Sequence, residues 1–196
     1  MRKVSKGENT RLFILKAFTD LVFAKGFYSI TLNDISNKVG ISQQGIYKHF
    51  KSMNYIITSA CLHWVQEAQA AIDGHSNSLL SAKIQLVSMV EQNMQYSYKN
   101  RKKDALLIGL YYYAMTSRSA MEVYQKIKND GTLRIHALIA QGNRENSWNI
   151  KNPKEKAITI HSLLVGEIFK MIIEPTEQDI DSRIKKTTHE ILLLLS

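Results

Sequence analysis

Five polar side chains able to form hydrogen bonds lie within one segment of seven residues. Gln43 and Gln44 each carry an amide that donates and accepts at once, which is the pattern needed to pair with the major-groove edge of a base, adenine above all. Tyr47, Lys48 and His49 carry groups suited to phosphate oxygens. The chemistry that these residue types predict is recognition of double-stranded DNA.

Gly45 lies in the middle of this segment. Within a helix, Gly is less favourable than Ala by about 1 kcal/mol, a cost that makes sense where the wall of a DNA groove must come close to the backbone. We therefore predict base contacts from Gln43, Gln44 and Gly45. The alternative is an ordinary surface helix whose glutamine pair is only solvated.

Two short helices joined by a tight turn are predicted to present these side chains. Thr31 and Asp34 form a capping pair at the start of the first helix. Gly40 ends that helix, since the position after a helix often needs a positive φ, and Ser42 caps the second helix. The apolar positions of the two helices are Leu32, Ile35, Val39, Ile46 and Phe50. Such an arrangement is a helix-turn-helix.

Charge is concentrated near the beginning of the chain. The 196 residues carry a formal net charge of +9. Residues 1–60 contain nine Lys or Arg and three Asp or Glu, so they carry +6 and the remainder carries only +3. A basic N-terminal region joined to a nearly balanced larger one fits a DNA-binding domain attached to a second domain.

The segment from Arg11 to Ile56 resembles the N-terminal DNA-binding domain of the TetR-type transcriptional repressors. The matching motifs are Ala24-Lys25-Gly26-Phe27, Asp34-Ile35, Val39-Gly40-Ile41-Ser42, Gly45-Ile46-Tyr47 and His49-Phe50. After Phe50 the family commonly has Ser-Lys-Glu, whereas here Ser52 is followed by Met53 and Asn54. The predicted phosphate contacts are Thr31, Ser42, Tyr47, Lys48, His49 and Lys51.

The predicted fold is all-α, because proline occurs only twice and no stretch alternates apolar and polar residues. Residues 1–52 are expected to form the three-helix DNA-binding domain, and residues 53–196 a larger helical domain for ligand binding and dimerisation. Helices are predicted at residues 9–25, 53–72, 79–98, 105–116, 153–172 and 177–195, with a polar break at 99–103 and a polar loop at 142–152. Residues 117–129 and 131–141 are predicted to form either one interrupted helix or two consecutive helices.

The last two predicted helices each carry an apolar stripe. In TetR-type proteins the final two helices pair with those of a second copy, and two recognition helices then reach a near-palindromic operator, with a spacing of about 34–36 Å. The alternative is that the stripes pack inside one subunit. The predicted interface residues are Ile160, Leu164, Ile168, Ile180, Ile184, Ile191 and Leu195.

Aromatic residues are frequent in the middle of the larger domain, where TetR-type repressors usually bind a small molecule that changes operator affinity. Rings supply apolar area and hydroxyls supply orientation, although aromatic residues at helical spacing are also common in helical cores. The predicted pocket residues are Tyr96, Tyr111, Tyr112, Tyr113, Met115, Tyr124, Trp148 and Phe169.

Enzyme, metal and membrane functions find no support in the motifs. None of the common nucleotide-binding, zinc-protease or hydrolase motifs is present, and the six histidines lack metal-ligand spacing, so we expect no catalysis, metal or cofactor. A single cysteine, no signal-peptide pattern and only short apolar runs favour the cytoplasm.

The sequence thus predicts a homodimeric, sequence-specific transcriptional repressor, released from its operator by a small-molecule effector. The alternatives are a transcriptional activator, a DNA-binding protein without a ligand, and a helical binding module without sequence-specific DNA recognition.

Overall fold

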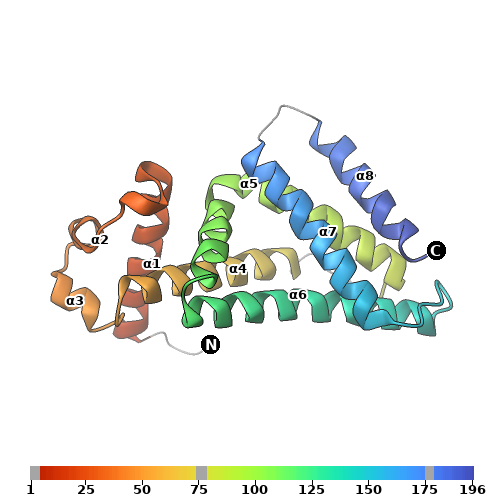
Figure 1. The fold of residues 1–196 in the computed structure, drawn as a ribbon, viewed down its shortest axis with the longest axis horizontal. Helices are drawn as coiled ribbons and strands as arrows, with labels where there is room; N and C mark the ends of the chain where they lie inside the picture. Colours follow the sequence, from red (N-terminus) through yellow and green to blue (C-terminus); the bar gives the residue numbers. More distant parts are fainter. Residues whose placement is uncertain (1–4, 74–78, 175–178) are drawn as a thin grey trace. The chain divides into compact units, whose positions relative to one another are not determined.

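The computed structural model describes residues 5–73, 79–174 and 179–196. This described part of the chain is helical, without strands, which confirms the all-α prediction (Figure 1). Its elements are α1 (Lys6–Lys25), the 3-10 turn η1 (Phe27–Ser29), α2 (Leu32–Val39), α3 (Gln43–Tyr47), α4 (Met53–Asp73), α5 (Ala82–Ala114), α6 (Arg118–Arg144), α7 (Pro153–Ile173) and α8 (Ile180–Leu193).

The chain forms two compact units. The first contains the described residues up to Gln66 together with Ala105–Tyr124, and the second contains Glu67–Asp104 and the described residues from Gln125 onward. The predicted boundary after Ser52 therefore lies inside the first unit, because the first half of α4 packs with the DNA-binding helices. A division by function remains a prediction.

The first unit has a core built around α1. The buried side chains of α1 include Ile14, Ala17, Phe18 and Leu21, whose helical spacing places them on one face. Phe18 meets the ring of Phe27 edge-on, with 6.1 Å between centroids. A Cβ at Gly109 would overlap that same Phe27 ring, so only a glycine allows this close approach. These contacts fix the C-terminal part of α5 to the DNA-binding helices.

The second unit has a separate apolar core. Trp148 closes one end of it: its indole Nε1 donates a hydrogen bond of 2.8 Å to the carbonyl of Ile139. The side chain of Asn143 bonds both the N–H and the carbonyl of Ile150, at 2.9 Å each, and ties the loop after α6 to that helix. The core residues are Ala82, Leu86, Val90, Met94, Ile135, Ile139, Trp148, Ala157, Ile160, Leu164, Met171, Ile184, Ile191 and Leu195.

Two predicted helix breaks differ from the structure. Helix α6 continues through Gly131, where the ring of His161 packs against the glycine backbone, so this residue marks a close contact and not an interruption. The predicted loop at 99–103 is only a kink at Asn100, with φ −114° and ψ 18°, inside α5. The Asn100 amide stabilises the kink by donating to the carbonyl of Tyr96 at 2.9 Å. Glu177, the predicted start of the last helix, lies outside the described residues.

The residue assignment of the predicted dimer interface needs correction. Of the seven side chains, five are buried in the core of the subunit and the other two pack against it. A side chain enclosed by its own chain has no surface left for a second copy, so the alternative of packing inside one subunit describes the five buried residues, whereas contact of the two partly buried ones with a second copy stays a prediction. The five buried ones are Ile160, Leu164, Ile184, Ile191 and Leu195, and the partly buried ones are Ile168 and Ile180.

Candidate nucleic-acid interface

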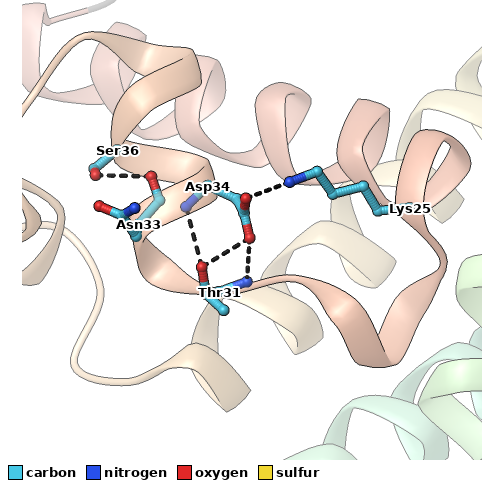
Figure 2. Close-up of polar contacts among 5 residues, drawn as sticks. All are labelled: Lys25, Thr31, Asn33, Asp34 and Ser36. Carbon is cyan, nitrogen blue, oxygen red and sulfur yellow. Dashed lines mark hydrogen bonds and ion pairs between the residues drawn. The ribbon is translucent and has the colours of Figure 1, made fainter.

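Helix α2 begins with a reciprocal cap. The N–H of Asp34 donates to Thr31 Oγ1 at 3.2 Å, and Asp34 Oδ2 accepts from the Thr31 N–H at 2.9 Å and from its hydroxyl at 2.7 Å. Figure 2 shows these bonds together with the ion pair between Lys25 and Asp34. The Thr31 hydroxyl hydrogen points at Asp34, so this residue, a predicted phosphate contact, instead serves to begin the helix.

The carboxylate of Asp34 is stabilised in its charged form. The bond from Lys25, followed by those from Thr31, lowers the pKa of Asp34 well below its ordinary value of 3.8. Lys25 is thereby engaged within the domain, and Lys38 similarly lies 3.5 Å from Asp20. Two of the basic residues counted in the sequence thus brace α2 against α1.

The turn between α2 and α3 depends on Gly40. Its φ of 74° and ψ of 28° are left-handed, and a Cβ there would meet no other atom within 4 Å, so the backbone angle and not space requires glycine. The N–H groups of Gly40 and Ile41 both donate to the carbonyl of Ser36, at 2.8 and 3.2 Å. These two bonds satisfy the end of α2 and turn the chain toward α3.

Helix α3 is capped and anchored as predicted, and it ends at Tyr47. The Gly45 N–H donates to Ser42 Oγ at 3.1 Å. Ile46 and, just beyond the helix, Phe50 are buried and fix its inner face. The exposed outer face presents Gln43, Gln44, Tyr47 and Lys48, with His49 half-buried and Lys51 exposed beyond it.

The packing of the free protein does not explain why residue 45 on α3 is a glycine. A Cβ at Gly45 would lie 3.5 Å from both Ile41 Cβ and Ser42 Oγ, which is ordinary van der Waals contact. Its backbone angles are helical, so alanine would fit without strain. The packing of the free protein therefore gives no reason for a glycine at this position.

Arg11 tethers the end of the recognition segment, a role that sequence reasoning missed. Its guanidinium donates to the carbonyl of His49 at 2.5 Å and lies 4.3 Å above the centroid of the Phe50 ring. The hydrogen bond goes to the main chain, so Arg11 positions His49 and Phe50. The only sequence signal was its place at the start of the family resemblance.

Helix α4 begins shortly after the recognition segment, at Met53. The N–H of Tyr55 donates to Ser52 Oγ at 3.2 Å, so Ser52 caps this helix. Met53, which stands where the family commonly has lysine, is half-buried, whereas Lys51 is exposed on the other side of the cap. Lys48 and Lys51 are thus the exposed cations nearest to α3 in sequence.

The family comparison supports this interpretation of the geometry. Residues 14–59 match the bacterial regulatory proteins of the tetR family. The chain carries a TetR-family DNA-binding domain. The uncharacterised HTH-type transcriptional regulator YerO of Bacillus subtilis (strain 168) is 36% identical over 52 residues, which are 26% of this chain and 18% of that protein. The likeness to YerO is therefore confined to about a fifth of its length.

Solved structures extend the TetR-family likeness to the whole fold. A bacterial regulatory protein of the tetR family from Rhodococcus RHA1 has a TM-score of 0.75 at 19% identity, covering 98% of each chain. A TetR transcription regulator from Haloarcula marismortui ATCC 43049 has a TM-score of 0.81 at 10% identity, covering 95% of this chain and 96% of that one. The family is one of DNA-binding regulators and not of enzymes.

The predicted ligand-pocket residues fall into both compact units. Tyr111, Tyr112, Tyr113, Met115 and Tyr124 belong to the first unit, and Tyr96, Trp148 and Phe169 to the second. The Tyr111 and Tyr124 rings meet edge-on at 4.9 Å, and burial, with a smaller effect of Tyr124, raises the pKa of Tyr111 to about 12. Met115 is 73% exposed, and Trp148 is a core residue.

A cavity of about 330 Å³ lies in the second unit and contains none of these predicted residues. Its walls come from the end of α4, the start of α5 and the second half of α6, and include Ile72, Met89, Leu138 and Arg134. No sequence pattern marked these positions, because a cavity results from how helices distant in sequence pack. In the described residues no three His, Cys, Asp or Glu side chains form a metal-binding group, and no helix has the length and apolar character to cross a membrane.

Proposed function

We propose that this chain is a homodimeric transcriptional repressor that inserts α3 into the major groove of a near-palindromic operator. The observation that carries the proposal is the outer face of α3, where exposed amides, a phenol and an ammonium group are presented by a helix fixed from within. The Ser42 cap, the buried Ile46 and the Arg11 tether hold this face in place before DNA arrives.

Each residue of the interface has an assigned role. Gln43 and Gln44 read base edges, and Gly45 lets the groove wall come close. The phosphate contacts are Ser42, Tyr47, Lys48, His49 and Lys51, all of them exposed or half-buried. Thr31 is not among them, because its hydroxyl is bonded to Asp34.

The outward face of α7 is the proposed contact with a second copy. Ile173 is 66% exposed, and Val165 and Phe169 are half-buried on the same side of the helix. Gly166 lies among them, and a Cβ there would meet nothing within 4 Å, which leaves room for another helix to cross closely. We expect Val165→Glu with Ile173→Glu to give monomers by light scattering, whereas a persisting dimer would remove α7 from the interface.

Release by a small molecule completes the proposal. A structural neighbour from Saccharomonospora viridis, with a TM-score of 0.81 at 18% identity and coverage of 94% of this chain and 96% of that one, was solved in complex with choline. We assign DNA reading to residues 1–52 and effector binding to residues 53–196, with the cavity of the second unit as the candidate effector site. Such a regulator would act in the cytoplasm, beside the DNA.

The test is fluorescence anisotropy of the purified protein on the DNA upstream of its own gene, against a scrambled duplex at near-physiological salt. Preference of roughly a thousandfold or more would establish a sequence-specific reader. A reporter gene placed behind the bound DNA then separates repression from activation. Weak, equal and salt-sensitive binding to both duplexes would favour a helical module without sequence-specific recognition.

A further inference from the structure

A second groove, of about 550 Å³, lies between α6 and the first half of α7. Its size falls within the roughly 300–1,000 Å³ of small-molecule sites. Both helical segments belong to the second compact unit, so the groove is formed within one body. Four of its lining side chains are basic or can become cationic, namely Lys128, His136, Lys154 and His161.

The groove has a positive electrostatic character. Among the nine described residues that line it, none is acidic. Burial, followed by the charges of Arg134 and Lys128, lowers the pKa of His161 below its ordinary value. Burial disfavours a charge of either sign, whereas the effect of Arg134 and Lys128 has the sign that attracts an anion. Asp130 accepts a hydrogen bond of 2.9 Å from Lys126. The charges of Asp73 and Asp130 raise the pKa of Arg134, but burial of Arg134 lowers that pKa by more.

Basic and apolar side chains line the same groove. The His161 ring packs closely against α6, since a Cβ at Gly131 would lie 2.5 Å from its Nε2. Leu133 from α6 and Ile158 from α7 are 63% and 48% exposed, so both offer apolar surface to a ligand. Each of the two helices contributes basic and apolar side chains to the lining.

We propose that this groove binds an amphipathic organic anion. Its oxyanion head group, a phosphate or a carboxylate, pairs with Lys128 and Lys154, and a short apolar portion covers Leu133 and Ile158. The hydroxyls of Thr132 and Ser162 line the same groove and supply further donors. No residue of the DNA-binding segment takes part, so the inference does not depend on the proposed function.

Calorimetric titration of the full chain with three probes tests the ligand class. Hexyl phosphate should bind saturably and at least about tenfold more tightly than inorganic phosphate, since burial of two methylenes is already worth that much. Hexyltrimethylammonium, with the same chain and the opposite charge, should not bind. Equal affinity for hexyl phosphate and inorganic phosphate, or for the cationic and anionic probes, would overturn the assignment.

Matched lysine variants test the place of binding. Lys128→Gln with Lys154→Gln should weaken hexyl phosphate binding about tenfold or more, because two charged donors are lost. Lys185→Gln with Lys186→Gln removes the same charge from exposed positions of α8 and should leave the affinity unchanged. The chemical shifts of the His136 and His161 ring protons should move with hexyl phosphate in the wild-type chain.

Two results would assign the groove otherwise. Equal affinity in both lysine variants, with unmoved His136 and His161 signals, would place the probe elsewhere on the chain. A change of assembly state in the Lys128→Gln, Lys154→Gln variant with unchanged affinity would overturn the ligand site and assign this groove to contact between copies. Light scattering on the same samples makes that distinction.

Discussion

The DNA-reading segment and the core of the second unit are stabilised by different kinds of interaction. In the reading segment, bonds join close neighbours in sequence: Thr31 with Asp34, Ser42 with Gly45, and Gly40 with the carbonyl of Ser36. In the second unit, apolar side chains separated by tens of residues, such as Leu86, Ile135 and Ile184, meet in one cluster.

The two regions also differ in whether the residues that stabilise the fold are the same as the residues assigned to binding. In α3 the buried Ile46 holds the helix and is distinct from the outward glutamines, so DNA binding can change while the fold stays intact. On α7 the stripe first assigned to a second copy is the core itself. A substitution there should therefore act first on stability.

The largest expected effect is the loss of a core side chain. Ile160→Ala, at a position with no exposure, should lower the free energy of unfolding by about 2–5 kcal/mol, because a cavity is left where the side chain was packed. Ile158→Ala, on the outer face of the same helix and 48% exposed, is the matched control and should cost less than about 1 kcal/mol. Urea unfolding followed by circular dichroism measures both, and equal losses would contradict the separation of inner and outer faces.

Local chemistry explains why the reading segment could be predicted. The cap at Thr31, the left-handed Gly40 and the cap at Ser42 each depend on residues no more than four positions apart, so the sequence contains the whole interaction. The role of Arg11 could not be predicted, because its partners, His49 and Phe50, lie almost forty residues away in the sequence.

Packing explains what could not be predicted in the second unit. An apolar stripe on a long helix indicates that one face is covered but not by what, and Ile160 and Ile184 are covered by their own chain. Gly131 suggested a helix break, whereas the contact that explains it comes from His161 on another helix. The two cavities also arise from helices distant in sequence.

Loss of base reading is the next effect in size. Gln43→Ala and Gln44→Ala should each reduce discrimination between the operator and single-base variants by about 1–3 kcal/mol, without changing unfolding, because both side chains are exposed. Competition anisotropy on a set of operator variants measures this discrimination. An equal loss on operator and scrambled DNA would mean that the glutamines do not read bases.

Lys48→Ala is expected to cause a smaller loss of DNA affinity, equal on every DNA sequence. If Lys48 neutralises one phosphate, the slope of log affinity against log salt should become shallower by about 0.9 on any DNA sequence. Lys185→Ala is the control, since Lys185 is an exposed lysine on α8, outside the DNA-binding helices, and its removal should leave the slope unchanged. A slope that stays the same for Lys48→Ala would remove this residue from the DNA backbone.

Gly45→Ala separates stability from binding at a single position. Alanine fits the free protein and is the better helix former, so the free energy of unfolding should rise by up to about 1 kcal/mol. Affinity for the operator should fall, because the added methyl group stands between α3 and the groove wall. A variant that is more stable and binds DNA as tightly as the wild type would show that the backbone does not approach the groove so closely.

The smallest effect concerns acid pH and the cap of α2. The pKa of Asp34 is lowered in the folded state, chiefly by Lys25. Its contribution to stability is therefore fully present above the ordinary value of 3.8, begins to fall near that value, and is lost as the pH falls further toward the lowered pKa. Asp34→Asn removes the charge, so the stability difference from wild type should shrink as the pH falls from 7 toward 3. Helix content at increasing urea, measured at several pH values, gives this difference, and a constant gap would show that the Asp34 charge does not stabilise the cap.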